Sequence, residues 1–420
     1  MKWILCERQL IRAITAINRR KLRCLLVRTG LGVTSLVLVL QVANLNQRGT
    51  LLRNDFVAYW AAGRLNLAGG NPYAPDQLLR LEQQAGWTRD EPLHLWNPPW
   101  LLAVIMPFSL PSYPVGGLLW LALNLGVTAI AIDWCWRLYG GSHRSRMLAL
   151  IISFSFGPTL INFEFGQLAP LMLLGMGGFL HFEGQRRWFL AGVLPALALF
   201  KPQLVYLFWL ALLLWAVKER RGMTLLGVVA ACAVATAIAW LPNRAVIGQY
   251  LASLVNSPVW AFLPHTAGGL LRFLLGTERL WVQFVLLPFG IAWLAAYWHR
   301  HHSHWDWAEQ TPLLLLVSLV TTPYGWTSDE MVLLVPVLQM LALLQRVGRR
   351  SLTIGGILFY ATFNVLMLLP WLSGVYGWHL GWPLVYLGLY GSAAILLAVY
   401  IPLRMSMGAG RRMVPHLVEG

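Results

Sequence analysis

Charged residues are scarce in this chain, and the short motifs by which many enzymes hold nucleotides are missing. Asp, Glu, Lys and Arg make up only 11% of the residues, whereas hydrophobic residues make up 58% and there are 22 Trp. A soluble domain could not bury so much apolar surface, so the composition predicts an integral membrane protein. The sequence has no GxxxxGK phosphate loop and no Asp-x-Asp pair, which disfavours an ATP-driven pump and a metal-dependent sugar-nucleotide transferase.

Cysteine is also rare, and its positions do not suit a disulfide or a zinc site. The four cysteines are Cys6, Cys24, Cys135 and Cys232, in a basic arm, at a helix edge or inside apolar runs. The histidine-rich stretch HRHHSH at 299–304 lacks the rigid ligand spacing of a metal centre. We therefore expect no disulfide, no metal and no cofactor.

The formal charge of +16 does not indicate nucleic acid as a partner, because Lys and Arg gather in short loops between apolar runs. Residues 1–28 hold eight Lys or Arg before an apolar run at 25–45, the pattern of a signal anchor with a cytoplasmic N-terminus. Alternating the sides of the later runs places most of the 32 Lys and Arg inside. The pattern predicts a bacterial inner-membrane protein with both termini in the cytoplasm.

Twelve apolar runs approach the length needed to cross a bilayer about 30 Å thick. After 25–45 they fall at 112–136, 147–162, 166–182, 187–200, 203–217, 222–241, 280–298, 311–323, 329–346, 351–371 and 382–403. The stretch 100–110 is too short for a regular span and is interpreted as re-entrant, although a short tilted span would fit as well. We expect an all-α polytopic membrane protein with about twelve (11–13) spans.

The most strongly patterned stretch after the first apolar run is NDFVAYWAAGRLNLAGGNPY at 54–73. Helical spacing puts Phe56, Tyr59, Trp60 and Gly63 on one face, and Gly69-Gly70-Asn71-Pro72 stops the helix. Asp55 stands in the first turn, where a carboxylate stabilises free backbone amides. The pattern predicts an amphipathic helix on the membrane surface, with the Asp55 carboxylate at the mouth of the membrane and either a capping or a chemical role.

Polar residues at the ends of the other apolar runs fall on the same, external side of the expected topology. They are Asn97, Glu164, Gln167, Lys201, His265, Arg272, Asp329 and Glu330. Ionisable groups at the edges of apolar helices are expensive, so they more often face a cavity than lipid. The sequence predicts a site built from separate external loops, although Lys201 would also suit an interfacial anchor and Glu164 a structural role.

Five motifs together resemble the membrane glycosyltransferases of family 87. They are DFVAYWAAGRLNLAGGNPY, WNPPWLLAVIMPFSLPSYP, FGQLAPLMLL, LFKPQLV and TTPYGWTSDEMVLLVP, in family order from residue 54 to about 340. The resemblance implies the GT-C fold, a large external loop (46–97) with interfacial helices, and a hexose donor carried on polyprenyl phosphate. It also implies that Asp55 is the general base of an inverting, metal-independent transfer to an envelope lipid or glycan acceptor.

The other site residues follow from what such a reaction needs. Lys201 is the first candidate for the donor phosphate, with Gln167, Arg272 and His265 as further donor-binding candidates. Tyr59, Trp60 and Asn97 are expected to support the site. The actinobacterial members of the family carry a histidine pair where this chain has Ser328 and Asp329, so Asp329 is a possible second acidic residue, and mannose is favoured as the sugar without being required.

We expect a single membrane domain, residues 1–420, with a catalytic half at 24–241 and an acceptor side at 242–420. A lipid-linked sugar flippase or another secondary transporter is the alternative, and a glycan ligase or polymerase would share the same geometry. A transporter should carry ionisable residues near the middle of its spans, whereas here they gather at one face. This distribution favours the enzyme.

Overall fold

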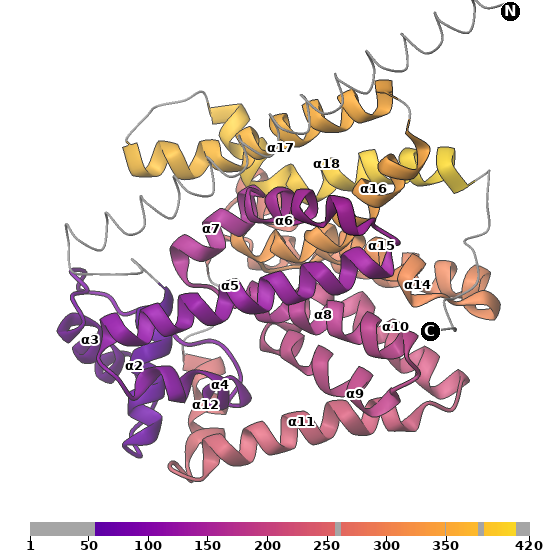
Figure 1. Cartoon of the computed structure of the whole chain (residues 1–420). Helices are drawn as coiled ribbons and strands as arrows, with labels where there is room; N and C mark the ends of the chain where they lie inside the picture. Colours follow the sequence, from indigo (N-terminus) through magenta and orange to yellow (C-terminus); the bar gives the residue numbers. More distant parts are fainter. Residues whose placement is uncertain (1–54, 257–261, 349, 377–381, 409–420) are drawn as a thin grey trace, which may run out of the picture.

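The computed structural model describes residues 55–256, 262–348, 350–376 and 382–408. The expected signal anchor at 25–45 lies outside these residues, as do Cys6 and Cys24. Within the described ranges all regular structure is helical and no strand occurs, which confirms the all-α prediction (Figure 1).

The described chain forms α-helices joined by short 3-10 segments. The α-helices are α2 (Asp55–Leu67), α3 (Pro75–Gln84), α4 (Trp100–Ser109), α5 (Tyr113–Leu138), α6 (Arg146–Phe154), α7 (Gly157–Phe165), α8 (Ala169–Gly184), α9 (Trp188–Val193), α10 (Tyr206–Lys218), α11 (Gly222–Trp240), α12 (Val246–Asn256), α13 (Ala267–Leu275), α14 (Leu286–His301), α15 (Trp307–Thr321), α16 (Leu334–Val347), α17 (Arg350–Tyr376) and α18 (Trp382–Gly408). The 3-10 segments are η1 (His143–Ser145), η2 (Leu194–Phe200), η3 (Pro202–Val205), η5 (Leu280–Phe284), η6 (His302–His304) and η7 (Thr327–Leu333).

Five helical segments of the described chain are long and apolar enough to cross a membrane. They are Tyr113–Leu138, Gly222–Trp240, Leu280–His304, Thr327–Val347 and Ser351–Leu368, and the pair α6 and α7, bent by 60°, makes a sixth if it counts as one span. Every apolar run expected after residue 111 coincides with helix, but several of these helices are shorter than a span. A total of twelve spans therefore stays a prediction.

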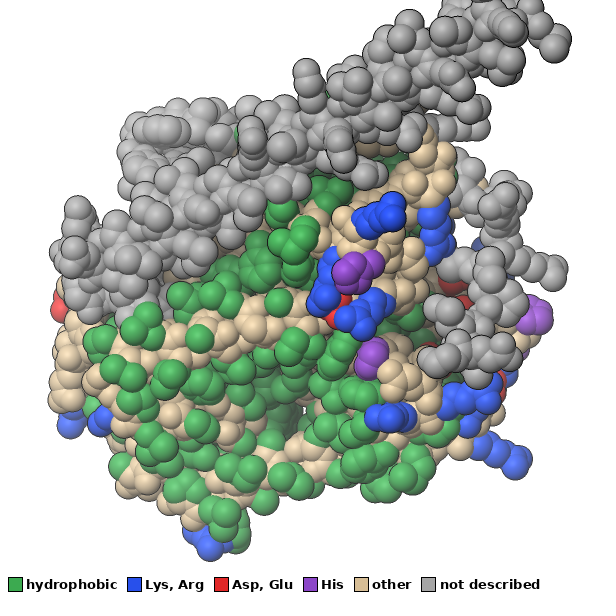
Figure 2. All heavy atoms as spheres, in the orientation of Figure 1, with side chains coloured by type: hydrophobic (Ala, Val, Ile, Leu, Met, Phe, Trp, Pro, Cys, Tyr) green, Lys and Arg blue, Asp and Glu red, His purple; other side chains and the backbone are tan. Residues whose placement is uncertain are grey.

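Large apolar side chains are exposed along the outer faces of these long helices, among them Leu118, Val229, Val234 and Phe289. Figure 2 shows hydrophobic side chains covering the face over α5, α9 and α11, with Lys, Arg and His mainly toward one end. Contacts join basic loops there: Arg221 lies over the Trp188 ring and Lys218 donates to the carbonyl of His302. Helices α2 to α4 lie at the other end of α5 (Figure 1).

Helix α2 forms where the sequence predicts it, but the prediction that it is amphipathic is wrong, and its place at a membrane surface stays a prediction. All residues from Phe56 to Gly63 are buried, so both faces pack against protein. At Gly63 a methyl group would collide with the Ser109 side chain, which shows how closely α4 approaches. The Trp60 indole donates to the carbonyl of Pro111 (3.1 Å), which fixes α2 against the α4–α5 turn. A helix that is apolar all round is one that a protein interior encloses.

Two buried hydrophobic clusters hold the helices together. The larger contains side chains of α8, α10, α15 and α16, and the smaller contains side chains of α2, α4 and the first half of α5. Helix α5 contributes to both, so it connects α2 with the rest of the bundle. This packing sets α2 beside the ends of α7 and η2.

Candidate active site

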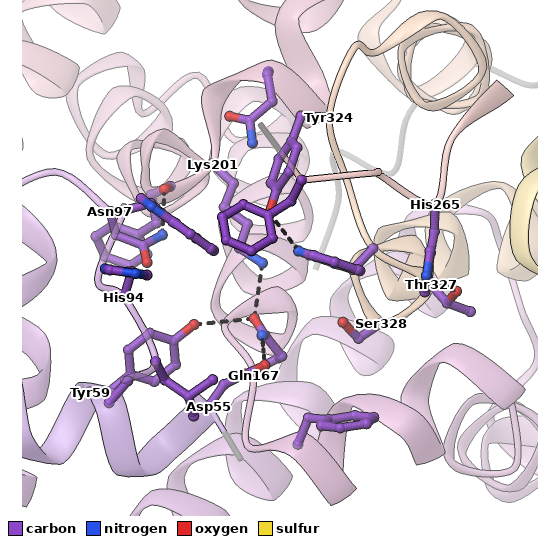
Figure 3. Close-up of a pocket in the computed structure, with 18 of the residues that line it drawn as sticks. Asp55, Tyr59, His94, Asn97, Gln167, Lys201, His265, Tyr324, Thr327 and Ser328 are labelled. Atoms are coloured by element: carbon purple, nitrogen blue, oxygen red, sulfur yellow. Dashed lines mark hydrogen bonds between the residues drawn. The ribbon is translucent and has the colours of Figure 1, made fainter. Parts of the chain in front are cut away.

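A cavity of about 1020 Å³ brings together segments from distant parts of the chain. Most of its walls come from five segments: α2, the segment 87–98, the end of α7 with Gln167, the junction of η2 and η3, and the segment 323–328 with His265. A few residues of α12, η5 and α17 add to the lining. Figure 3 shows labelled side chains of all five segments around the same space. Asn97, Tyr59, Asp55, Gln167, Lys201 and His265 all line it, as expected of a site built from separate loops.

Asp55 is the first residue of α2 and stands at the floor of this cavity in Figure 3. Its Oδ2 atom accepts a hydrogen bond from the Gln167 side-chain amide. Burial disfavours the charged carboxylate and raises its pKa to about 6, opposed by the Gln167 hydrogen bond and the Lys201 charge. A carboxylate with this pKa is ionised at neutral pH and still basic enough to take up a proton.

Gln167 is the centre of the hydrogen-bond network in the cavity. Gly166 ends α7 in the left-handed conformation (φ 65°), and the Gln167 backbone N–H then bonds to the carbonyl of Asn162 (3.1 Å). The Gln167 Oε1 atom accepts from the Tyr59 hydroxyl (3.2 Å) and from the Lys201 ammonium (2.9 Å). The dashed lines in Figure 3 show these contacts meeting at the one amide.

Lys201 stands between η2 and η3 and lines the cavity with its ammonium group beside a buried carboxylate. Its Nζ atom lies 2.7 Å from Asp329 Oδ1, and the two side chains are 10% and 1% exposed. The second Asp329 oxygen accepts from the Trp326 backbone N–H (3.0 Å). Asp329 itself does not line the cavity, so the structure makes it the counter-ion of Lys201.

His265 lines the opposite wall next to the segment 323–328. Its Nδ1 atom lies 3.1 Å from Thr327 Oγ1, and its ring meets that of Trp326 edge to face. Burial lowers the pKa of His265 to about 4, because an apolar environment disfavours the imidazolium ion. The imidazole is therefore neutral at physiological pH and acts as a hydrogen-bonding group rather than as a cation.

Asn97 lines the cavity and joins the segment 87–98 to its surroundings. Its side-chain amide donates to the backbone carbonyl of Phe200 (2.9 Å), directly before Lys201, and the Asn97 backbone carbonyl accepts from the Tyr73 hydroxyl (3.2 Å). Trp60 points away from the cavity, toward Pro111. Asn97 thus positions a wall of the site, and Trp60 positions α2.

The structure does not bring Arg272 into the cavity lining. Its side chain is 5% exposed, and the guanidinium donates to the carbonyls of Thr277 (2.7 Å) and Phe262 (3.0 Å) and to Gln283 Oε1 (2.9 Å). These contacts tie together the segment between α12 and α14. Arg272 therefore supports a loop at the cavity edge and is not placed to touch a ligand inside it.

Several lining residues were not singled out from the sequence. They are Trp87, Arg89, Glu91, His94, Trp96, Tyr250, Phe262, Tyr324, Trp326 and Thr327. The run of aromatic and charged residues before Asn97 and the motif around Asp329 were the available signals, but a single chain does not say which members face inward. In the part of the chain that the structure describes, no group of His, Cys, Asp or Glu is arranged to hold a metal ion.

The fold and the cavity define a helical membrane protein with a partly buried carboxylate beside a paired lysine. The sequence model of glycosyltransferase family 87 matches residues 95–323, more than half of the chain. The chain belongs to this family, and it is a multi-pass membrane glycosyltransferase. No curated protein and no solved structure matches it. The matched range contains Asn97, Gln167, Lys201 and His265, whereas Asp55 and Asp329 lie outside it.

Proposed function

We propose that this glycosyltransferase moves a hexose, with mannose favoured, from a polyprenyl-phosphate donor to an envelope lipid or glycan acceptor. The observation that carries the proposal is the Asp55 carboxylate, whose pKa of about 6 suits a base, in one cavity with the Lys201 ammonium. A base and a cation are the two groups that transfer from a lipid phosphate requires.

In the proposed reaction Asp55 takes the proton of an acceptor hydroxyl as that oxygen attacks the anomeric carbon. The new glycosidic C–O bond forms on the face opposite the phosphate, so the configuration inverts. The bond between the anomeric carbon and the phosphate oxygen breaks, and polyprenyl phosphate leaves with the electron pair. A positioned base contributes roughly two to four orders of magnitude in rate.

Lys201 supplies positive charge for the leaving phosphate, and its pairing with Asp329 holds the ammonium in place before the donor binds. The neutral His265 imidazole offers a further hydrogen bond from the opposite wall. Ile161, Phe165 and Met367 give one part of the lining an apolar surface, which suits the first isoprene units of the donor. The scheme needs neither a metal nor another cofactor.

We place the site on the external face of a bacterial inner membrane, with cytoplasmic termini. Lys, Arg and His gather mainly at one end of the described helices (Figure 2), whereas Asp55 belongs to α2 at the other end. The positive-inside rule makes the basic end cytoplasmic. We further assign residues 24–241, with the external loop 46–97, to the catalytic half and 242–420 to the acceptor side.

The test is hexose transfer from a synthetic polyprenyl-phosphate donor by the purified chain, comparing wild type with Asp55→Asn. Loss of about a hundredfold or more is expected of Asp55→Asn, because the amide cannot take up the proton. The matched control is Asp76→Asn on α3, whose carboxylate is exposed and paired with Arg80, and it should stay active. Equal activity of all three proteins would refute the base, and a wild type that translocates the lipid without transfer would favour the flippase.

A further inference from the structure

We infer that Gln167 is the positioning residue of the catalytic base: it holds the Asp55 carboxylate by Oδ2 and keeps Lys201 from pairing with it directly. This inference rests on the proposed role of Asp55. It gives Gln167 a task different from the expected contact with the donor sugar or phosphate. The basis for it is the direction in which the Gln167 amide points.

Two donors decide that orientation. The Lys201 ammonium has only hydrogens to offer, and it lies 2.9 Å from Gln167 Oε1. The Tyr59 hydroxyl donates to the same oxygen (3.2 Å). Turning the amide over would set its NH₂ group against the ammonium, which would keep only Asp329 as an acceptor, and would set its oxygen against the Asp55 carboxylate. The Nε2 atom must therefore face Asp55, where it donates to Oδ2.

The consequence for the carboxylate is that one oxygen is held and the other is left for the substrate. Among the described residues no hydrogen bond reaches Asp55 Oδ1, and Asp55 belongs to the lining of the cavity. Rotation of the carboxylate would break the Gln167 contact, so Oδ1 keeps its direction. A base gains from a fixed direction because proton transfer needs hydrogen-bond geometry to the attacking hydroxyl.

The amide also sets the charge balance of the site. Asp55 is faced by Lys201 from the η2–η3 junction, by Asp329 from η7, by Tyr59 on its own helix and by Tyr324 from the segment 323–328. A direct ion pair with Lys201 would stabilise the ionised carboxylate and make it a weaker base. Gln167 stands between the two, while Asp329 takes the lysine charge (2.7 Å).

The decisive measurement is the pH dependence of kcat/KM for the purified full-length chain with polyprenyl-phosphate mannose, comparing wild type with Gln167→Met. Methionine has a similar length and no N–H donor. Because kcat/KM reports the free enzyme, the acid limb of wild type should lie near pH 6. Because methionine still fills the space between Asp55 and Lys201, the limb of Gln167→Met should move up by about one pH unit or more, since a hydrogen bond that favours the ionised form is lost. The donor KM should change less than about twofold, because uniform donor binding is untouched.

The control is Gln339→Met, which removes another buried glutamine whose Oε1 accepts from a tyrosine hydroxyl, that of Tyr400. It should leave the acid limb in place. Gln167→Leu also lacks an N–H donor and keeps an apolar side chain between Asp55 and Lys201, so it carries the same expectation should the Met variant fold poorly.

An unshifted limb with a raised donor KM would overturn the inference and assign Gln167 to donor binding. An unshifted limb with an unchanged KM would overturn it as well. Failure of the underlying function looks different, because Asp55→Asn would then stay active whatever Gln167 does.

Discussion

The pair formed by Lys201 and Asp329 allows structure and catalysis to be separated by one mutant cycle. We expect Lys201→Met alone to be strongly destabilised, because it leaves the Asp329 carboxylate, 1% exposed, without its counter-ion. Asp329→Asn alone should cost less, since the Lys201 ammonium keeps Gln167 as a partner and lines the cavity. The double variant should recover most of the stability and none of the activity.

The magnitudes follow from burial. Removing one partner of a buried ion pair costs about 3–5 kcal/mol, whereas replacing both by neutral residues is often close to neutral. For Asp329→Asn we expect about 1–3 kcal/mol, the cost of one unmade bond to a charged group. In the double variant both residues are neutral, so no buried charge remains. The amide oxygen that replaces the carboxylate can still accept from the Trp326 N–H, the contact that Asp329 makes at 3.0 Å.

Equilibrium unfolding in mixed detergent micelles gives the free energies, and hexose transfer by the folded fraction gives the activity. Without the ammonium the leaving phosphate loses its cation, so Lys201→Met and the double variant should both fall about a hundredfold or more. A double variant no more stable than Lys201→Met would refute the counter-ion assignment. A double variant with normal transfer would refute the phosphate role of Lys201.

Two further predictions concern positions away from the reacting groups. Glu82 is fully buried, and its Oε2 accepts from the Leu93 N–H (3.0 Å). Burial raises its pKa from 4.5 to about 7, so between these pH values the folded protein holds a proton that the unfolded chain has released. The free energy of unfolding therefore falls as the pH rises from 4.5 to 7. Glu82→Gln removes that proton exchange, so its melting temperature relative to wild type should rise from pH 4.5 to pH 7, and a constant difference would contradict the reasoning. Gly63→Ala should destabilise by about 1–3 kcal/mol because its methyl group meets Ser109, whereas Gly126→Ala, with open space around it, should be harmless; equal melting temperatures for the two variants would argue against close packing of α2 on α4.

The sequence predicted the elements of the fold better than their surroundings. The helix starting at Asp55 follows from local pattern and from the glycines after it. The spacing of Phe56, Tyr59 and Trp60 on one face does not predict its complete burial, which follows because Val57, Ala58 and Ala61 make the other face apolar as well. A helix without a polar side was the available sign that it would be enclosed.

The site was predictable where a polar residue interrupts apolar sequence, as at Gln167 and Lys201. The pairing of Lys201 with Asp329 was not, because the two residues are 128 positions apart and only the packing of η7 against the rest of the bundle brings them together. Arg272 shows the converse, since a lone arginine between two apolar runs gives no sign that nearby carbonyls and the Gln283 side chain will surround its guanidinium. Local pattern identifies candidates, and long-range packing selects among them.

The contacts from Asp55 through Gln167 and Lys201 to Asp329 join residues that are synthesised at different times. The chain is made from its N-terminus, so the residue that holds Lys201 in place is synthesised long after the proposed base. A product that stops before residue 323 has Asp55 and Lys201 but lacks the counter-ion Asp329 and the wall at 323–328. The cavity is therefore incomplete until the segment 323–328 has been synthesised.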